Sequence, residues 1–169
     1  MKTCALIAGS KRQQPITRSF LKKQLALLCS DFGVEKILSG VHRGDELNCL
    51  DQLLKIRPIY PNLKICAVFI HEEEARMWDE KDRELLFRAV SGCDEEWILH
   101  PFGGSEMRFQ RNILMMNAAD LVLLLKEDEE IEFWASKMRK PILKISGYPL
   151  QLIPDIHLYR DRDNDTSIG

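Results

Sequence analysis

The sequence lacks the features that would assign it to a membrane or an exported protein. It has no apolar run approaching the ~20 residues that span a bilayer. Met1, Lys2 and Thr3 lead directly into a short apolar run that ends at Gly9 and Ser10, and not into a long apolar signal segment. We therefore expect a cytoplasmic protein with no membrane partner.

An excess of charge of one sign is also missing. The chain of 169 residues has 24 Lys and Arg against 26 Asp and Glu, which gives a formal net charge of −2. This balance provides no broad positive field to attract a phosphate backbone. Nucleic acid is therefore not an expected partner, and any site for an anion must be local.

Cysteine pairs and metal-binding motifs are missing as well. The five cysteines are scattered and contain no Cys-x-x-Cys pair, so we expect reduced and mostly buried thiols. The four histidines share no ligand spacing, and no metal site is predicted. The series Asp161-x-Asp163-x-Asp165 has Thr166 where a calcium loop needs glycine, so a solvated tail is the better interpretation.

What the chain does contain is a regular alternation of short apolar runs with helical patterns. The strands are expected at 4–8, 34–38, 63–70, 96–100, 121–125 and 141–145, and the helices at 16–32, 45–57, 71–93, from Arg111 to about 118, and 131–138. The wholly apolar run 121–125 must be covered on both faces, which is typical of a central strand in a parallel sheet.

This alternation predicts an α/β fold, Rossmann-like and doubly wound, with a mostly parallel sheet and helices on both faces. Residues 1–148 are expected to form one such domain. Residues 149–169 are expected to form a C-terminal extension whose polar end is flexible.

In a sheet of this kind the loops after the strands meet at one edge, where ligands bind. Glycine turns let backbone N–H groups approach a phosphate, and an arginine can clamp it with two hydrogen bonds. Neither a full Gly-x-Gly-x-x-Gly motif nor a Gly-x-x-x-x-Gly-Lys motif is present. The expected ligand-binding residues are Gly9, Ser10, Arg12, Gly40, Gly44, Asp45, Arg111 and Asn112.

Each of these signals also has a purely structural interpretation. Gly40 and Gly44 could serve only as tight turns before a helix that Asp45 caps. Arg111 and Asn112 could cap and solvate the start of their helix. The charged run 126–130 is best read as a helix start, although Glu127 or Asp128 could contact a ribose or act as a base.

Several motifs resemble those of a known family. They are Ile37-Leu38-Ser39-Gly40, Gly44-Asp45-Glu46-Leu47, Tyr60-Pro61-Asn62-Leu63-Lys64, Arg111-Asn112 and Ala119-Asp120-Leu121. As a set they resemble the YpsA-like family of bacterial proteins, in the SLOG superfamily of DprA and the Lonely Guy phosphoribohydrolases.

The resemblance implies a Rossmann-like fold with a pocket for a nucleotide or nucleotide derivative. It implies binding by Gly9, Ser10, Gly40, Gly44 and Arg111, with Asp45 and Asn112 behind them. It does not extend to the Pro-Gly-Gly-x-Gly-Thr loop and glutamate of the Lonely Guy enzymes, because this chain has Lys126-Glu127-Asp128-Glu129-Glu130 there. Phosphoribohydrolase activity is therefore not implied.

Three functions remain open, and whether the protein is an enzyme is undecided. The favoured one is a sensor or regulator that binds a nucleotide derivative and reports it to a protein partner. The second is a hydrolase of an N-glycosidic or phosphate bond, with Arg111 stabilising negative charge and Glu127, Asp128 or Glu72 as general base. The third is an interaction module with a vestigial pocket and a contact surface at 72–74.

Self-association is a further expectation. The helices carry more apolar residues than one sheet side can cover, with Phe87 beside Leu86 and Trp134 beside Phe133. A homo-oligomer is therefore among the expected partners.

Overall fold

The computed structural model describes residues 1–11, 15–100, 106–145 and 151–152. Strands and helices alternate along the chain, and their order is β1 (Thr3–Ile7), α1 (Arg18–Ser30), β2 (Lys36–Gly40), α2 (Asp45–Ile56), β3 (Lys64–His71), α3 (Glu80–Ser91), β4 (Glu95–His100), α4 (Met107–Ala118), β5 (Leu121–Leu124), α5 (Glu129–Lys137), β6 (Ile142–Lys144) and β7 (Gln151–Leu152).

The strands form a single sheet in the order β4-β3-β2-β1-β5-β6-β7. Pairing is parallel from β4 through to β6, and β7 pairs antiparallel with β6. The chain adds strands on one side of β1 as far as β4 and then returns to the other side with β5. The strand order therefore reverses between β1 and β5, which is the switch point where Rossmann-like folds bind ligands.

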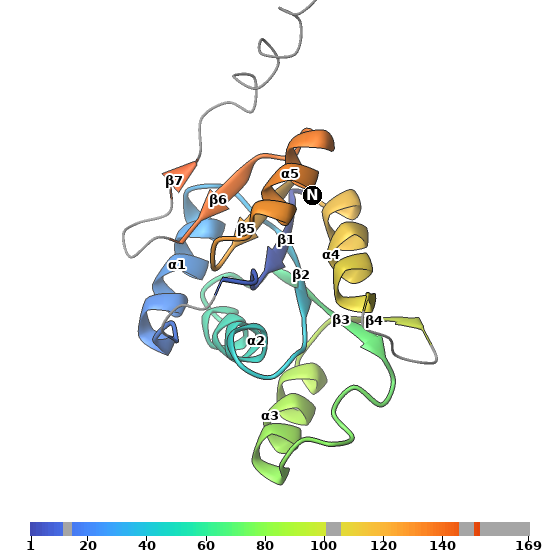
Figure 1. Cartoon of the computed structure of the whole chain (residues 1–169). Helices are drawn as coiled ribbons and strands as arrows, with labels where there is room; N and C mark the ends of the chain where they lie inside the picture. The colour runs from blue at the N-terminus through green and yellow to red at the C-terminus, as the bar shows by residue number, and fades with distance from the viewer. Residues whose placement is uncertain (12–14, 101–105, 146–150, 153–169) are drawn as a thin grey trace, which may run out of the picture.

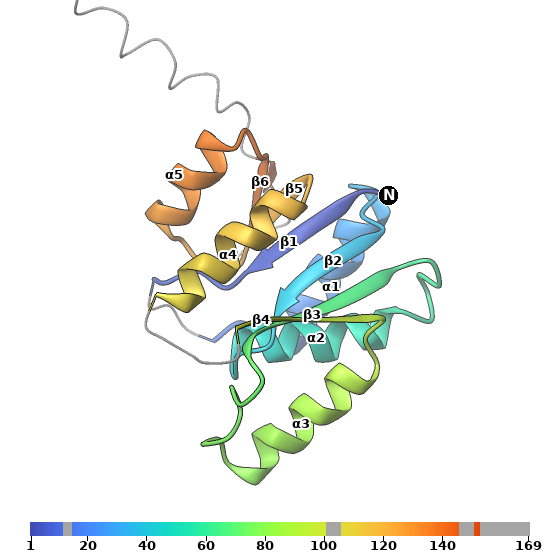
Figure 2. The same cartoon turned by 90° about the vertical axis from the view of Figure 1, so that its right-hand side faces the viewer.

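Two helix layers cover the sheet. Figure 2 shows α1, α2 and α3 on one face and α4 and α5 on the other. Within β1, Cys4 and Leu6 pack toward the first layer, and Ala5 and Ile7 pack toward the second. The predicted fold class, an α/β Rossmann-like sheet that is mostly parallel with helices on both faces, is confirmed (Figure 1).

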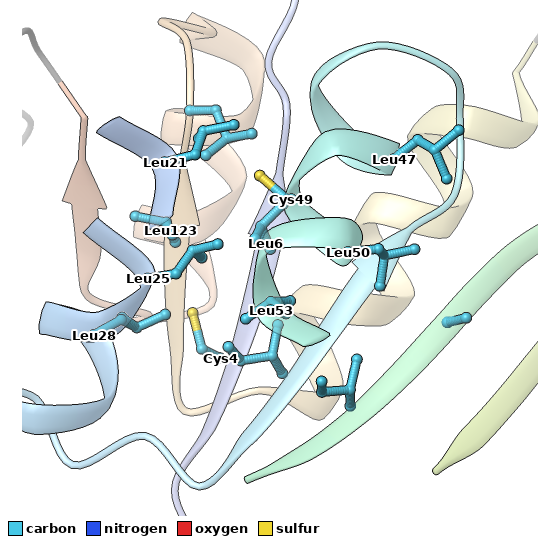
Figure 3. Packing of buried hydrophobic residues seen from close by; sticks show 14 of the residues in the cluster. Cys4, Leu6, Leu21, Leu25, Leu28, Leu47, Cys49, Leu50, Leu53 and Leu123 are labelled. Carbon is cyan, nitrogen blue, oxygen red and sulfur yellow. The ribbon is translucent and has the colours of Figure 1, made fainter. Parts of the chain in front are cut away.

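The larger core lies between the sheet and helices α1 and α2 (Figure 3). Leu21, Leu25 and Leu28 recur at three- and four-residue spacing, so they share one face of α1, and all three are fully buried. They meet Leu53 of α2 and Leu123 of β5 in one cluster. Burying each such side chain stabilises the fold by about 1.5–3 kcal/mol.

Strand β5 has the double cover that its apolar sequence predicts. Leu121 and Leu123 belong to the cluster beneath α1 and α2, whereas Val122 and Leu124 pack with α4 and α5. All four are buried, and the strand pairs with β1 on one side and β6 on the other. The interpretation of this run as an interior strand of a parallel sheet is therefore correct.

The expected helix start at His71 is wrong. His71 is the last residue of β3, and α3 begins at Glu80, after Asp79 accepts a hydrogen bond from the backbone N–H of Asp82 at 2.8 Å. The acidic run 72–74 lies in turns, because the Glu74 carboxylate accepts from the backbone N–H of Ile70 at 2.9 Å. That hydrogen bond holds the Glu74 side chain against the end of β3, so its charge does not lie in the first turn of α3.

Helix α4 also begins earlier than the polar pair indicates. It starts at Met107, so Arg111 and Asn112 lie in its second turn, and both are buried on the face that carries Met115 and Met116. The interpretation of this pair as a solvated helix start is therefore wrong.

Strand β7 was not expected from the sequence. The domain boundary after residue 148 stays a prediction, because residues 146–150 and 153–169 lie outside the described residues. No helix in the described part of the chain is both long enough and apolar enough to cross a bilayer.

Candidate functional site

The first turn of α2 lies at the carboxyl ends of β1 and β2 and is strongly acidic. Gly44 is the N-cap residue, with a φ of 100° that favours glycine, and Asp45 and Glu46 follow in the first turn. The sequence had indicated that Asp45 caps this helix, and the structure shows that it does not. Its carboxylate instead pairs with the Lys126 ammonium at 2.6 Å, which brings the loop after β5 against the start of α2.

Glu46 is paired with the most deeply buried cation of the site. Arg111, whose side chain is 1% exposed, donates from Nη1 and Nη2 to the two carboxylate oxygens of Glu46 at 3.0 and 2.5 Å. Asn112 Oδ1 accepts from Nε and Nη2 of Arg111 at 3.4 and 3.1 Å. The guanidinium is thus held in a two-pronged ion pair, the arrangement that also recognises phosphate.

Gly40 makes this ion pair possible. It ends β2, and among the described glycines only Gly9, Gly33 and Gly44 have positive φ, so its interpretation as a tight turn is wrong. A Cβ at Gly40 would lie 2.2 Å from Glu46 Oε2 and 2.5 Å from Arg111 Nη1. The missing side chain therefore leaves room for Arg111 to reach Glu46 across the strand end.

His42 connects Glu46 to a second buried carboxylate. Its backbone N–H donates to Glu46 Oε2 at 2.9 Å, and its ring Nδ1 lies 3.5 Å from Glu74 Oε1. The ring also makes an edge contact with Trp78, with centroids 5.6 Å apart. The loop after β2 and the turn after β3 therefore meet through one histidine.

Glu74 is the least satisfied polar group of the site. Its side chain is 5% exposed and Oε2 accepts from Ile70, but Oε1 is buried with no hydrogen-bond partner among the described residues. Burial raises the pKa of Glu74, but interactions with His42, the Ile70 N–H and the Arg111 charge outweigh it and hold the pKa below its ordinary value. Glu74 is therefore an ionised, acceptor-only group at neutral pH.

The loop after β1 packs directly against the loop after β5. Gly9 has a φ of 81°, and a Cβ there would lie 2.1 Å from the Lys126 carbonyl oxygen. The backbone N–H of Lys11 donates to the Glu127 carbonyl at 3.1 Å, and the side chains of Lys11 and Glu127 form an ion pair. Lys126 thus contacts Gly9 through its backbone and Asp45 through its side chain.

The structure therefore assembles most of the predicted site. Through Glu46 and Lys126 it brings together Gly40, Gly44, Asp45, Arg111 and Asn112, with Gly9 beside Lys126. Ser10 is exposed in the loop after β1, and Arg12 lies outside the described residues.

Sequence reasoning missed Glu46, Lys126 and the inward direction of Glu74. The available signal was the pair of adjacent acids after Gly44, because two neighbouring carboxylates are expected to form ion pairs with nearby cations.

The three residues considered as general bases do not surround Arg111. Glu127 pairs with Lys11, and the hydrogen bond from Lys11 lowers its pKa, which makes it a weaker base. Asp128 caps α5 by accepting from Ile131 N–H at 3.1 Å, and Glu72 is exposed in a turn. No hydrogen bond or ion pair within the described residues joins any of the three to Arg111.

A separate apolar groove of about 760 Å³ lies beside α4. None of the predicted site residues lines it. Its lining residues are Leu99, Phe109, Gln110, Ile113, Leu114, Asn117 and Ala118. The described part of the chain holds no cluster of His, Cys, Asp and Glu arranged to bind a metal ion.

The chain is similar to known proteins of one family. The family model YpsA, described as the YspA SLOG family, matches residues 7–156. A UPF0398 protein of Bacillus velezensis is 29% identical over 154 residues, which cover 88% of this chain and 79% of the relative. A UPF0398 protein of Bacillus licheniformis is 29% identical over 119 residues, covering 69% of this chain and 63% of the relative.

Proposed function

Because the chain belongs to the YspA SLOG family, we propose that it binds a nucleotide or nucleotide derivative at the carboxyl edge of its sheet and acts as a sensor or regulator. The ligand would lie where the loops after β1, β2 and β5 meet the first turn of α2. A bacterial cytoplasm would suit the five free cysteines and the Bacillus relatives.

The observation that carries this proposal is the buried ion pair of Arg111 and Glu46 over the end of β2. Removing two charges from water is unfavourable, and apolar residues of similar size would often stabilise a fold as well or better. A buried charged pair that stability alone does not require is a candidate for a functional role. Here the pair lies close to the switch point and against a helix N-terminus, where anionic ligands of Rossmann-like sheets bind.

Arg111 would contribute to ligand binding by holding the loop after β2 in place. It holds Glu46, and Glu46 holds the His42 N–H, so the guanidinium positions the residues that precede α2. A phosphate would meet the backbone N–H groups near Gly44 and in the loop of Gly9 and Ser10, where positive φ lets the backbone approach a ligand. An anion that reaches Arg111 itself would have to compete with Glu46.

Binding without turnover is favoured over hydrolysis. A general base must lie within hydrogen-bonding reach of its proton and have a pKa near the working pH. Glu127, Asp128 and Glu72 are each engaged or directed elsewhere. The carboxylate that does contact Arg111, Glu46, is bound to it through both oxygens.

A thermal-shift screen tests the proposal. The protein is heated with nucleotides, dinucleotides and ADP-ribose derivatives, and a ligand at a hundred times its dissociation constant should stabilise it by ~2.7 kcal/mol, or roughly 5 to 10 °C. Arg111→Ala should abolish this shift, whereas Arg108→Ala, an exposed arginine on the same helix, should keep it.

Ser10→Glu provides a variant that does not disturb the core. Ser10 is exposed, so the substitution should leave the melting temperature unchanged while its negative charge repels a phosphate at the loop after β1. No shift with any compound would overturn the proposal. Release of a base or of phosphate from a bound compound would instead show that the protein is a hydrolase.

A further inference from the structure

The buried oxygen Glu74 Oε1 defines one contact that the ligand must make. The other oxygen, Oε2, is fixed by the Ile70 N–H at 2.9 Å, so the orientation of the carboxylate is set by the end of β3. Oε1 forms an ion pair with His42 Nδ1 at 3.5 Å, which is longer than an ordinary hydrogen bond and leaves Oε1 able to accept from a further donor. Buried carboxylate oxygens almost always accept a hydrogen bond, so the lack of one at Oε1, inside a candidate binding site, points to a donor on the ligand.

The chemistry of Oε1 restricts the kind of atom. An ionised carboxylate accepts hydrogen bonds and donates none, so its partner must be a donor. The oxygens of a phosphate are acceptors with negative charge, and they are excluded at this point. The remaining donors of a nucleotide are its sugar hydroxyls and the N–H groups of its base.

The surroundings of Oε1 favour the sugar. His42, Glu46 and Arg111 form a continuous polar cluster with Glu74, through contacts of 2.5 to 3.5 Å. Proteins hold a base mainly by stacking on aromatic side chains, whereas they hold a ribose through hydrogen bonds from its hydroxyls to polar groups such as these. The Arg111 and Glu46 charges cancel, so one negative charge, that of Glu74, remains to strengthen a bond from a neutral hydroxyl.

Building on the proposed function, we propose that Glu74 Oε1 accepts a hydrogen bond from a ribose hydroxyl of the ligand, and that nucleotides lacking this hydroxyl bind more weakly. The phosphates then lie toward Gly9 and Gly44, and the ribose lies toward the turn after β3.

Isothermal titration calorimetry tests this assignment with ADP, GDP, CDP and UDP, each compared with its 2′-deoxy and 3′-deoxy counterparts. For the wild-type protein, loss of the contacted hydroxyl should weaken binding about tenfold or more, the usual effect of removing a hydrogen bond to a charged group. Glu74→Gln keeps an acceptor for Ile70 N–H and replaces Oε1 with an amide donor. A ribose hydroxyl can accept from that amide, but the bond no longer involves a charged group, so the variant should lose most of the ribose preference.

Glu73→Gln is the matched control. Glu73 precedes Glu74, its side chain is 65% exposed, and it pairs with Arg76 at the surface, so its neutralisation should leave the ribose preference unchanged. A thermal melt of Glu74→Gln should show a folded protein.

The outcomes separate the two proposals. If the wild-type protein binds ribose and deoxyribose forms equally, or if Glu74→Gln keeps the preference, the assignment of Oε1 is wrong while nucleotide binding stands. If none of the four ribonucleotides binds at millimolar concentration, the proposed function fails for this class of ligand, and the assignment fails with it.

Discussion

Arg111 of α4 and Glu46 of α2 form a two-pronged ion pair although their helices lie on opposite faces of the sheet. The contact passes over the carboxyl end of β2, where Gly40 has no side chain to block it. The pair therefore joins the two helix layers at the edge where the candidate ligand site lies.

Replacing Arg111 should destabilise the protein strongly. Arg111→Met would leave the buried Glu46 charge without its partner, which should lower the free energy of unfolding by about 3–5 kcal/mol. Chemical denaturation measures this loss. Arg108→Met, on the exposed side of the same helix, should change stability by less than ~0.5 kcal/mol.

The double variant Arg111→Met with Glu46→Gln should be more stable than Arg111→Met alone. The neutral amide removes the unpaired charge and still accepts from the His42 N–H. Equal stability of the single and double variants would show that the cost does not come from a stranded carboxylate.

The close approach of the loops after β1 and β5 can be measured with glycine substitutions. Gly9 and Gly33 both have positive φ, 81° and 63°, so an alanine at either position introduces similar backbone strain. Only Gly9 would in addition place a Cβ 2.1 Å from a backbone oxygen, that of Lys126.

Gly33→Ala should therefore cost about 1–2 kcal/mol of unfolding free energy, and Gly9→Ala should cost clearly more. If the two variants unfold at the same denaturant concentration, the contact between Gly9 and Lys126 is not the constraint that the structure indicates.

The ionised state of Glu74 should contribute to stability at neutral pH. Its pKa in the folded protein lies below the ordinary value of 4.5, so its contribution is complete above that value and is lost as pH falls through the lower folded pKa. The groups that face it are His42 and Arg111. Glu74→Gln should remove this part of the acid destabilisation.

Unfolding free energies of wild type and Glu74→Gln, measured at intervals from neutral pH downward, test the point. Asp94, Glu95 and Glu127 also have lowered pKa values, but they are common to both proteins and cancel in the difference. A difference that stays constant across pH would contradict a lowered pKa of Glu74.

The five cysteines should resist alkylation in the folded protein. Burial raises the pKa of Cys29 and Cys93 to about 11 and that of Cys4 and Cys66 to about 12, and it raises the pKa of Cys49 well above its ordinary value. At pH 8 a thiol with a pKa of about 11 is ionised to roughly one part in a thousand.

A colorimetric thiol assay should therefore find slow reaction of the native protein and rapid reaction of five thiols after denaturation. Rapid modification of one thiol under native conditions would identify a reactive cysteine and contradict the structural role of all five.

The layered fold was predictable because its signals are local. Leu121 to Leu124 form an unbroken apolar run, and Leu21, Leu25 and Leu28 repeat with the helical period, so each element carries its own pattern. The two residues of β7 carry no such pattern. The start of α3 was misplaced because the acidic run at 72–74 imitates a helix N-terminus.

The residue types of the candidate site could be proposed from the sequence, and their pairing could not. Glycines, an arginine and an aspartate after parallel strands indicate an anion site, and the structure does gather most of them. The partner of Arg111 is 65 residues away in the sequence, and only the crossing of β2 brings the two together. The direction of Glu74 likewise depends on its bond to the end of β3.

The two edge strands of the sheet differ in their ability to pair with a strand of another molecule. On one rim the antiparallel β7 follows β6 and has only two residues, too few to template a further chain. On the other rim β4 runs for six residues at the end of the strand order. Within the described residues β4 is therefore the longer free edge, and two molecules that paired through their β4 strands would form a closed dimer and could not add a third by the same contact.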